Sequence, residues 1–242
     1  MPHVDSLAPK INEKIVAKAN KLGFCGIAIL STDRAFAKSY LHRNWIERGY
    51  HADMVYMTSN RDDFSKIMQN TNTVVLVSLD SPRVLSEEVA SFGKLASYIY
   101  LEDYHYVIKS KLRQLAEYIE QLLSESVSYR ACVDSAPILE RELAVMGGLG
   151  FIGKNGMLIT KTAGSFVMLG EMLLNIKLSE YISSSSQLQC DVCNRCIDSC
   201  PTGAIVGDKT VDARKCISYH TIENKEVIPI EMVSLYGIYQ NK

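Results

Sequence analysis

Residues 190–205 read CDVCNRCIDSCPTGAI, in which Cys190, Cys193, Cys196 and Cys200 follow the pattern C-x2-C-x2-C-x3-C-P. This spacing is typical of thiolates that hold [4Fe-4S] clusters, because three closely spaced cysteines reach the irons of one cubane and the fourth, followed by proline, is directed to a second cluster. Zinc sites more often pair two C-x2-C units or add histidines at short spacing. The stretch predicts a small iron–sulfur domain, with zinc or free thiols as the alternatives.

The other three cysteines are spread along the chain. Cys216 follows Cys200 by sixteen residues, and we expect it to ligate the second cluster, although an isolated cysteine is more often a small buried hydrophobe. Cys25 and Cys132 lie in apolar, strand-like contexts and are predicted core residues. A secreted disulfide scaffold would distribute its cysteines along a shorter chain. The distribution therefore indicates a metal or cluster site attached to a larger body.

The composition is that of an ordinary globular protein. The chain has 242 residues, 26 Lys+Arg against 27 Asp+Glu, a net charge of -1 and 47% hydrophobic residues. No apolar run approaches the roughly 18 residues of a membrane helix, and the N-terminus lacks the pattern of a secretory signal. The near-neutral charge argues against a dominant, sequence-independent hold on nucleic acid. We therefore expect a cytoplasmic protein with no membrane partner.

Helical and strand-like patterns alternate over the first three quarters of the chain. The Ser-rich stretch 181–189 is a plausible linker to the cysteine-rich segment. We therefore expect an α+β protein, with an α/β body over residues 1–178 followed by a small iron–sulfur domain over residues 179–242. The expected helices are 7–22, 33–48, 104–123 and one from Pro137 to Gly148, and the expected strands are 24–30, 73–79, 130–134, 156–160 and 165–174.

The glycine-rich stretch GLGFIGKN at 148–155 contains both G-x-G-x-x-G and G-x4-G-K. A dinucleotide or phosphate loop needs a strand directly before it and a helix directly after it, whereas here a helix precedes and a strand-like run follows. Asn155 also replaces the Ser/Thr of a phosphate loop. We therefore expect no nucleotide site, although a loop carrying Lys154 and Asn155 can hold another large polar ligand.

Asp134, in the run Val-Asp-Ser-Ala-Pro before a predicted helix, has two interpretations. An aspartate at this place is commonly a helix N-cap, which favours its ionised form. A general acid needs the opposite, a carboxyl kept protonated by a dry pocket or by a neighbouring negative charge. The residues alone favour the cap and leave the acid as the alternative.

Several stretches of the chain form a specific combination. They are GYHADMVY at 49–56, GKLASY at 93–98, DYH at 103–105, VDSAPILERELAVMGGLGFIGKNGMLI at 133–159, GSFVMLGEMLL at 164–174, the cysteine run and CISYHTIE at 216–223. Together they resemble the epoxyqueuosine reductases, which are cobalamin-dependent iron–sulfur enzymes of tRNA queuosine synthesis. The resemblance implies a corrinoid-binding α/β domain followed by a ferredoxin-like domain with two [4Fe-4S] clusters that supply electrons to cobalamin. The reduced cobalt would act on the epoxide of epoxyqueuosine, whose oxygen leaves as water.

The resemblance also implies roles for individual residues and partners. Asp134 matches the proton donor of the family, which changes the preferred interpretation of this residue from cap to acid. The partners would be tRNA bearing epoxyqueuosine and an electron donor such as a flavodoxin or ferredoxin. His51 and His105 are at least as well explained by structural hydrogen bonds as by cofactor contacts. The residues expected to line the corrinoid site are Lys154, Asn155, Ser97, Tyr98, Met157 and Ser165, together with Asp134.

One departure from the family concerns the cluster ligands. The family completes both clusters with a second cysteine group that begins Tyr-Gly-Cys, whereas residues 236–238 read Tyr-Gly-Ile here. Two cubanes need eight thiolates, and this region offers five. The chain could be shortened at its C-terminus, another chain could supply the missing ligands, or a full electron path could have been lost.

These possibilities keep other functions open. The first alternative is an iron–sulfur electron-transfer protein or an inactive homologue that retains the fold. The second is a corrinoid reductase of the reductive-dehalogenase type, against which the VDSAP run and the lack of an export signal argue.

Overall fold

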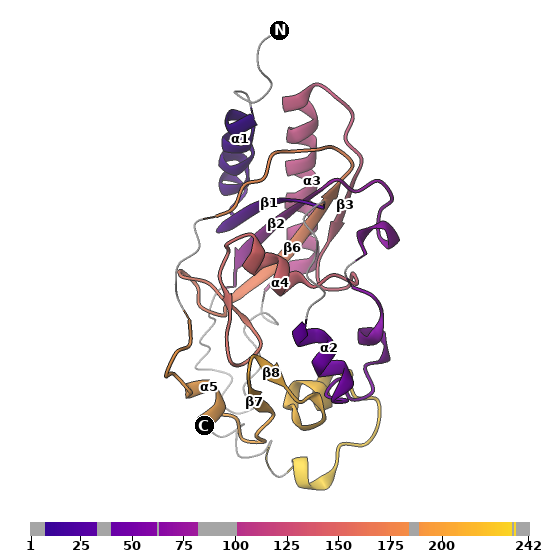
Figure 1. Cartoon of the computed structure of the whole chain (residues 1–242), viewed down its shortest axis with the longest axis vertical. Helices are drawn as coiled ribbons and strands as arrows, with labels where there is room; N and C mark the ends of the chain where they lie inside the picture. The colour runs from indigo at the N-terminus through magenta and orange to yellow at the C-terminus, as the bar shows by residue number, and fades with distance from the viewer. Residues whose placement is uncertain are drawn as a thin grey trace.

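A four-stranded antiparallel sheet is the centre of the computed structural model, which describes residues 8–32, 40–61, 63–81, 101–183, 189–233 and 235 (Figure 1). The strand order is β1-β2-β6-β3, and every neighbouring pair is antiparallel. The alternation of helices and strands along the chain therefore does not produce parallel pairing. The strands are β1 (Gly26–Ser31), β2 (Thr73–Asp80), β3 (Tyr129–Cys132) and β6 (Val167–Leu174).

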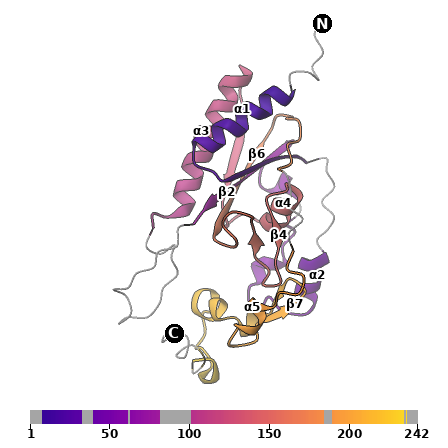
Figure 2. The ribbon, with the colours of Figure 1, turned by 90° about the vertical axis from the view of Figure 1, so that its left-hand side faces the viewer.

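Helices cover both faces of this sheet (Figure 2). On one face lie α1 (Ala8–Lys21) and α3 (Tyr104–Leu123), whose apolar residues pack with Val75 and Val77 of β2. On the other face α4 (Glu140–Met146) packs with Val74 and Leu76. Successive side chains of a strand point to opposite faces, so a strand with both faces covered is apolar throughout. This explains the continuous run TVVLVSL, which the sequence analysis correctly assigned to a strand.

The loops after α4 form a small hairpin of β4 (Phe151–Ile152) and β5 (Leu158–Ile159). A Cβ atom at Gly150 would overlap the carbonyl oxygen of Ile159, and one at Gly153 would lie 2.5 Å from Cδ1 of the same residue. Gly150 is thus required by close packing against the backbone of β5, whereas a side chain at Gly153 would only displace flexible side-chain atoms such as the end of Ile159. The expected order of a helix before the loop and a strand after it is observed, and the absence of a nucleotide site stays a prediction.

The cysteine-rich segment is built from short elements: α5 (Arg195–Asp198), β7 (Ile205–Gly207), β8 (Thr210–Val211), the 3-10 helix η6 (Ala213–Lys215) and the π-helix η7 (Tyr219–Glu223). They lie beside α2 (Tyr40–Glu47) at the end of the molecule away from α1 (Figure 1). The 3-10 helices η2 (Val55–Thr58) and η3 (Phe64–Lys66) lie between α2 and β2 in the chain.

Several hydrogen bonds join the N-terminal part of the chain to this segment, and two of them involve Trp45 and Tyr50. Trp45 Nε1 donates to the carbonyl oxygen of Val211 over 2.7 Å, and the backbone N–H of Ala213 donates to the carbonyl of Tyr50 over 2.8 Å. Residues of the predicted first domain thus contact the predicted second one. The mixed helix and strand content confirms the α+β class, while the domain division at residues 178 and 179 stays a prediction.

Most expected elements are present within a few residues of their expected bounds, and two expectations need correction. α4 begins at Glu140, later than the expected Pro137, because the N–H of Ile138 bonds to the carbonyl of Ala136 in a tight turn. Cys25 is exposed and is not a core residue, because it precedes the strand that begins at Gly26. The expected helix 33–48 is observed as α2.

Two parts of the expected elements lie outside the described residues, namely 33–39 of that helix and 184–188 of the expected linker. The helices among the described residues are too short or too polar to cross a membrane.

Candidate active site

The beginning of α3 carries a fixed imidazole. The carboxylate of Asp103 caps the helix by accepting from the backbone N–H of His105 over 2.9 Å, and its Oδ1 lies 2.8 Å from Nδ1 of the same histidine. These hydrogen bonds lower the pKa of Asp103, so the carboxylate is ionised and accepts from Nδ1–H. In the neutral ring this places the hydrogen on Nδ1 and leaves the lone pair on Nε2.

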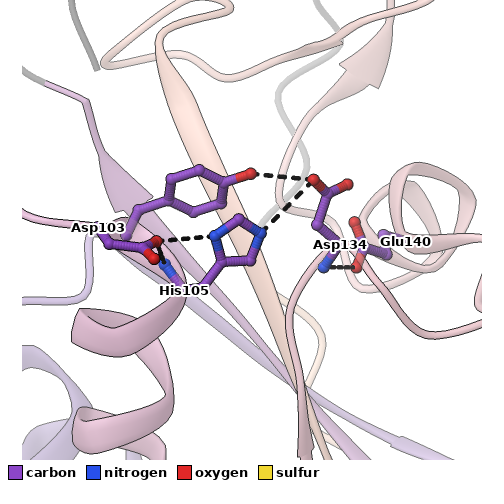
Figure 3. A network of polar contacts seen from close by, with 5 residues as sticks. Asp103, His105, Asp134 and Glu140 are labelled. Atoms are coloured by element: carbon purple, nitrogen blue, oxygen red, sulfur yellow. Dashed lines mark hydrogen bonds and ion pairs between the residues drawn. The ribbon is translucent and has the colours of Figure 1, made fainter. Parts of the chain in front are cut away.

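Asp134 faces that imidazole from the end of β3. Its Oδ2 accepts a hydrogen bond from Tyr104 Oη over 2.9 Å and lies 3.8 Å from His105 Nε2 (Figure 3). The Tyr104 and His105 rings stack with centroids 4.0 Å apart. Because 66% of the Asp134 side chain is exposed, a bound molecule can reach its carboxyl. The structure thus brings the candidate acid together with two groups that can exchange or share a proton.

The helix-cap interpretation of Asp134 is wrong. The N-cap of α4 is Leu139, which makes no side-chain cap bond, and the helix begins six residues after Asp134. Asp134 instead has a left-handed backbone with a φ of 61°, a conformation in which aspartate is several times more common than most residues. Its carboxyl is therefore turned away from α4 and toward α3 (Figure 3).

Two glutamates that the sequence analysis did not single out lie behind Asp134. The backbone N–H of Asp134 donates to Glu140 Oε1 over 2.7 Å, and Glu171 lies on β6 opposite Cys132 with a completely buried side chain. Burial, followed by the charge of Glu140, raises the pKa of Glu171 well above its ordinary value, and burial also raises that of Glu140. Both oxygens of Glu171 are without a hydrogen-bond partner among the described residues. The sequence feature that could have pointed to Glu171 is its place as the one acidic residue in the otherwise apolar run VMLGEMLL.

Two arginines stand near these carboxyls. Burial lowers the pKa of both Arg61 and Arg141, and the charges of Glu140 and Asp134 oppose that effect. Arg141 donates to the carbonyl of Gly156, which ties α4 to the glycine loop. Arg61 lies over the ring of Tyr56 at 5.9 Å from its centroid. These cations offset part of the negative charge of the glutamates and Asp134.

The glycine loop leads from this site to the cysteine segment. The Lys154 ammonium donates to the carbonyl of Asp191 and to Asn194 Oδ1, each over 2.8 Å, and the Lys154 backbone N–H lies 3.4 Å from Cys190 Sγ. The loop is closed by Asn155 Oδ1, which accepts from the backbone N–H of Met157 over 3.1 Å. Lys154 therefore connects the body of the protein to the first predicted cluster ligand.

The remaining corrinoid candidates have different surroundings. Ser165 is exposed, as is the adjacent Phe166, and 45% of Met157 is accessible. Hydroxyl, thioether and ring groups on one hairpin and its neighbouring loop fit a ligand such as a corrinoid, which combines a large apolar ring with amide arms. Ser97 and Tyr98 lie outside the described residues.

The two candidate histidines, His51 and His105, differ in their contacts. His51 packs edge-on against Trp45 with centroids 6.0 Å apart, and its buried Nδ1 has no hydrogen-bond partner among the described residues. His105 belongs to the Asp134 network.

The predicted cluster ligands are accessible to different degrees. Cys193 is exposed, whereas Cys190, Cys196, Cys200 and Cys216 are half-buried. Burial would raise the pKa of the Cys200 thiol, but hydrogen bonds from Ile205, Thr202 and Ala204 outweigh it and lower the pKa. In the described part of the chain, no three His, Cys, Asp or Glu side chains converge as metal ligands. The donor set, five soft thiolates with four in one short loop, nevertheless fits an iron–sulfur cluster.

Comparison with protein families gives two matches. Residues 61–135 match the family described as "Epoxyqueuosine reductase QueG, DUF1730", and residues 189–239 match the "4Fe-4S double cluster binding domain". The second match supports iron–sulfur clusters as cofactors. The first ends one residue after Asp134, so it includes the Asp103–His105 stretch and the Asp134 carboxyl.

Individual proteins give the same result. The chain is 41% identical over 225 residues to an epoxyqueuosine reductase of Cyclobacterium marinum, with 89% of this chain and 71% of that protein covered. Its fold matches the structure of epoxyqueuosine reductase from Streptococcus thermophilus with a TM-score of 0.78 and 29% identity, covering 92% of this chain and 60% of the other. A third match is a crystal structure of epoxyqueuosine reductase with an epoxyqueuosine-modified tRNA-Tyr stem loop, with a TM-score of 0.71, 25% identity and coverages of 93% and 60%. The chain thus spans between three fifths and about seven tenths of these relatives.

Proposed function

The chain belongs to the epoxyqueuosine reductase family, and we propose that it reduces epoxyqueuosine to queuosine in tRNA with Asp134 as the proton donor. The observation that carries the proposal is the accessible Asp134 carboxyl, which contacts Tyr104 and His105 on a chain so similar to named epoxyqueuosine reductases. The relative that was crystallised with a modified tRNA stem loop supports tRNA as the partner.

The reaction requires two electrons and two protons for each epoxide oxygen that leaves as water. An epoxide oxygen leaves poorly as an alkoxide, so a proton must reach it as the carbon–oxygen bond breaks. Asp134 Oδ2 and His105 Nε2 are 3.8 Å apart, so a proton can pass between them once the two side chains approach to hydrogen-bond distance. Asp103 holds the ring in the orientation that directs Nε2 toward Asp134. The role of this chain's residues is thus to hold a proton at an accessible oxygen.

We propose that the electrons enter through [4Fe-4S] clusters held by Cys190, Cys193, Cys196, Cys200 and Cys216. Cobalamin, when bound, would supply the reducing chemistry for the carbon–oxygen bond of the epoxide. The residues proposed to hold it are Lys154, Asn155, Met157, Ser165, Ser97 and Tyr98, with Asp134 beside it. A corrinoid domain over residues 1–178, an iron–sulfur domain over 179–242, a flavodoxin or ferredoxin as electron donor and a cytoplasmic location belong to the same proposal.

The test is an anaerobic reconstitution with iron, sulfide and cobalamin, followed by assay of iron, cobalt and turnover. We expect cobalt near one per chain, iron in the protein and conversion of an epoxyqueuosine-containing stem loop to the queuosine form. Iron without cobalt would instead support the alternative of an iron–sulfur electron-transfer protein. Cobalt and iron without turnover would indicate an inactive homologue that retains the fold.

A further inference from the structure

Lys154 lies in the turn of the β4–β5 hairpin. Two backbone hydrogen bonds close this turn, from the N–H of Gly153 to the carbonyl of Met157 and from the N–H of Gly156 to the carbonyl of Gly153, each over 2.9 Å. Arg141 of α4 also donates to the carbonyl of Gly156. The backbone at Lys154 is therefore held by the body of the protein, while its N–H and its side chain reach the cysteine-rich segment.

The contacts of Lys154 cover the whole loop 190–196, which reads CDVCNRC and carries the first three predicted cluster ligands. The Lys154 ammonium donates over 2.8 Å to the carbonyl of Asp191, which lies between the first and the second cysteine. It also donates over 2.8 Å to Oδ1 of Asn194, which lies between the second and the third cysteine. The Lys154 backbone N–H bonds to Sγ of Cys190 over 3.4 Å. One residue of the hairpin thus fixes both intervals of the loop and one of its sulfurs.

The loop has two local features that these contacts support. Asp191 has a left-handed backbone with a φ of 40°, a conformation that costs free energy and persists when its surroundings determine it. Asn194 precedes α5 as its N-cap, but its side chain makes no cap bond with that helix, and its oxygen accepts from Lys154 instead. A loop that is ordered in this way loses less conformational entropy when its thiolates bind iron.

We propose that Lys154 is a positioning residue of the first [4Fe-4S] cluster, which fixes the loop 190–196 against the β4–β5 hairpin and raises the reduction potential of the cluster. The inference rests on the proposed function, because it assumes that the cysteines of this loop hold the cluster. Reduction adds one electron, from the proposed flavodoxin or ferredoxin, and no proton moves and no bond breaks. A nearby ammonium and an N–H donor to a ligand sulfur both favour the more negative, reduced state. The hairpin also carries residues proposed to contact cobalamin, so Lys154 fixes the two cofactor sites relative to each other.

The first measurement is hydrogen–deuterium exchange of the full chain without added iron. Lys154→Met keeps the length of the side chain and removes its ammonium, and the matched control Lys161→Met removes the same charge from an exposed position after β5. We expect the amides of 193–199 to exchange about five- to tenfold faster in Lys154→Met, because a net hydrogen bond that orders the loop is lost. They should exchange in Lys161→Met as in wild type, and unchanged exchange of β2 and β6 shows that each variant is folded. Equal protection of 193–199 in Lys154→Met and wild type would overturn the positioning role.

The second measurement is the reduction potential of the full chain reconstituted anaerobically with iron and sulfide, in the absence of cobalamin. Titration with dithionite, followed by electron paramagnetic resonance of the reduced cluster, should give a lower midpoint potential for Lys154→Met than for wild type. Lys154→Arg retains the charge and should restore most of the difference, and Lys161→Met should match wild type. Equal midpoint potentials in Lys154→Met and wild type would overturn the electrostatic role. Absence of iron from wild type would instead overturn the proposed cofactor itself, a failure that leaves the exchange result unaffected.

Discussion

Asp134 combines an accessible carboxyl with a left-handed backbone. A substitution can therefore remove its acidic proton without changing the size of its side chain. Asp134→Asn keeps the size of the side chain and an oxygen that accepts from Tyr104 Oη, but it removes the acidic proton. We expect cobalamin binding to be retained and turnover to fall about 10²- to 10⁴-fold, the usual contribution of a general acid. The visible spectrum of bound cobalamin and a single-turnover assay measure the two effects. Retained turnover would rule out Asp134 as the donor.

Glu171 also makes a prediction about stability. Because the folded state keeps a proton that the unfolded chain releases near the ordinary carboxyl pKa, the folded state binds more protons between that pKa and the raised one. The free energy of unfolding therefore falls as pH rises through this window, by about 1.4 kcal/mol per pH unit at most. Glu171→Gln has no titratable proton at this position, so its free energy of unfolding should fall less than that of wild type as the pH rises from 5 to 8. Urea unfolding at the two pH values measures the difference, and a constant difference would contradict the prediction.

At this scale the sequence singled out Asp134 as a candidate, whose role stays a prediction, but it did not give the setting of this residue. The run Val-Asp-Ser-Ala-Pro suggested a cap because the next helix is close in sequence, but the left-handed backbone turns the carboxyl toward α3. Glu171 was not singled out, because its buried position opposite Cys132 comes from the pairing of β3 with β6. Contacts of this kind depend on tertiary structure and have no local pattern.

Among the elements, α3 was predicted completely and the hairpin of β4 and β5 in part. The helix from Tyr104 to Leu123 combines a regular apolar face with an aspartate cap, and both signals are local. The order and antiparallel direction of the strands were not predicted, since strand pairing brings together residues such as Val75 and Met172 from distant parts of the chain. The sequence thus indicated which segments are strands but not how they pair.

The β4–β5 hairpin gives a prediction at the scale of elements. Gly150→Ala would place a methyl group against the carbonyl of Ile159, which cannot move without displacing β5. We expect a loss of about 1–3 kcal/mol in the free energy of unfolding, measured by urea denaturation, and weaker cobalamin binding if the hairpin shapes that site. Lys161→Ala, exposed in the same region, should change stability by less than about 0.5 kcal/mol. Equal stability of the two variants would show that the hairpin adjusts freely.

At the scale of the whole molecule, hydrogen bonds connect the cysteine-rich segment to the rest of the protein. Beyond the bonds of Trp45 and Tyr50, the hydroxyl of Tyr219 donates to Asp53 Oδ2 over 3.1 Å, and that of Tyr56 donates to Glu223 Oε2 over the same distance. Tyr56 also contacts Arg61, which stands near Asp134. The residues around η2 thus contact both the cysteine segment and the neighbourhood of the candidate acid.

This connection allows the only tryptophan of the sequence to report on the clusters. Trp45 Nε1 bonds to Val211, five residues before Cys216, so loss of order in the cysteine segment should expose the indole to water. We expect Cys196→Ser to lower the iron content and to shift the Trp45 emission to longer wavelength. Cys25→Ser should change neither: although the residue is exposed, its thiol is partly desolvated against the body of the protein, and this desolvation together with Asp80 raises the pKa of Cys25 to about 11, so it stays a protonated thiol rather than a ligand. Equal iron content in the two variants would contradict the assignment of Cys196 as a ligand. If the iron is lost but the Trp45 emission is unchanged, the cysteine-rich segment is ordered by its protein contacts alone.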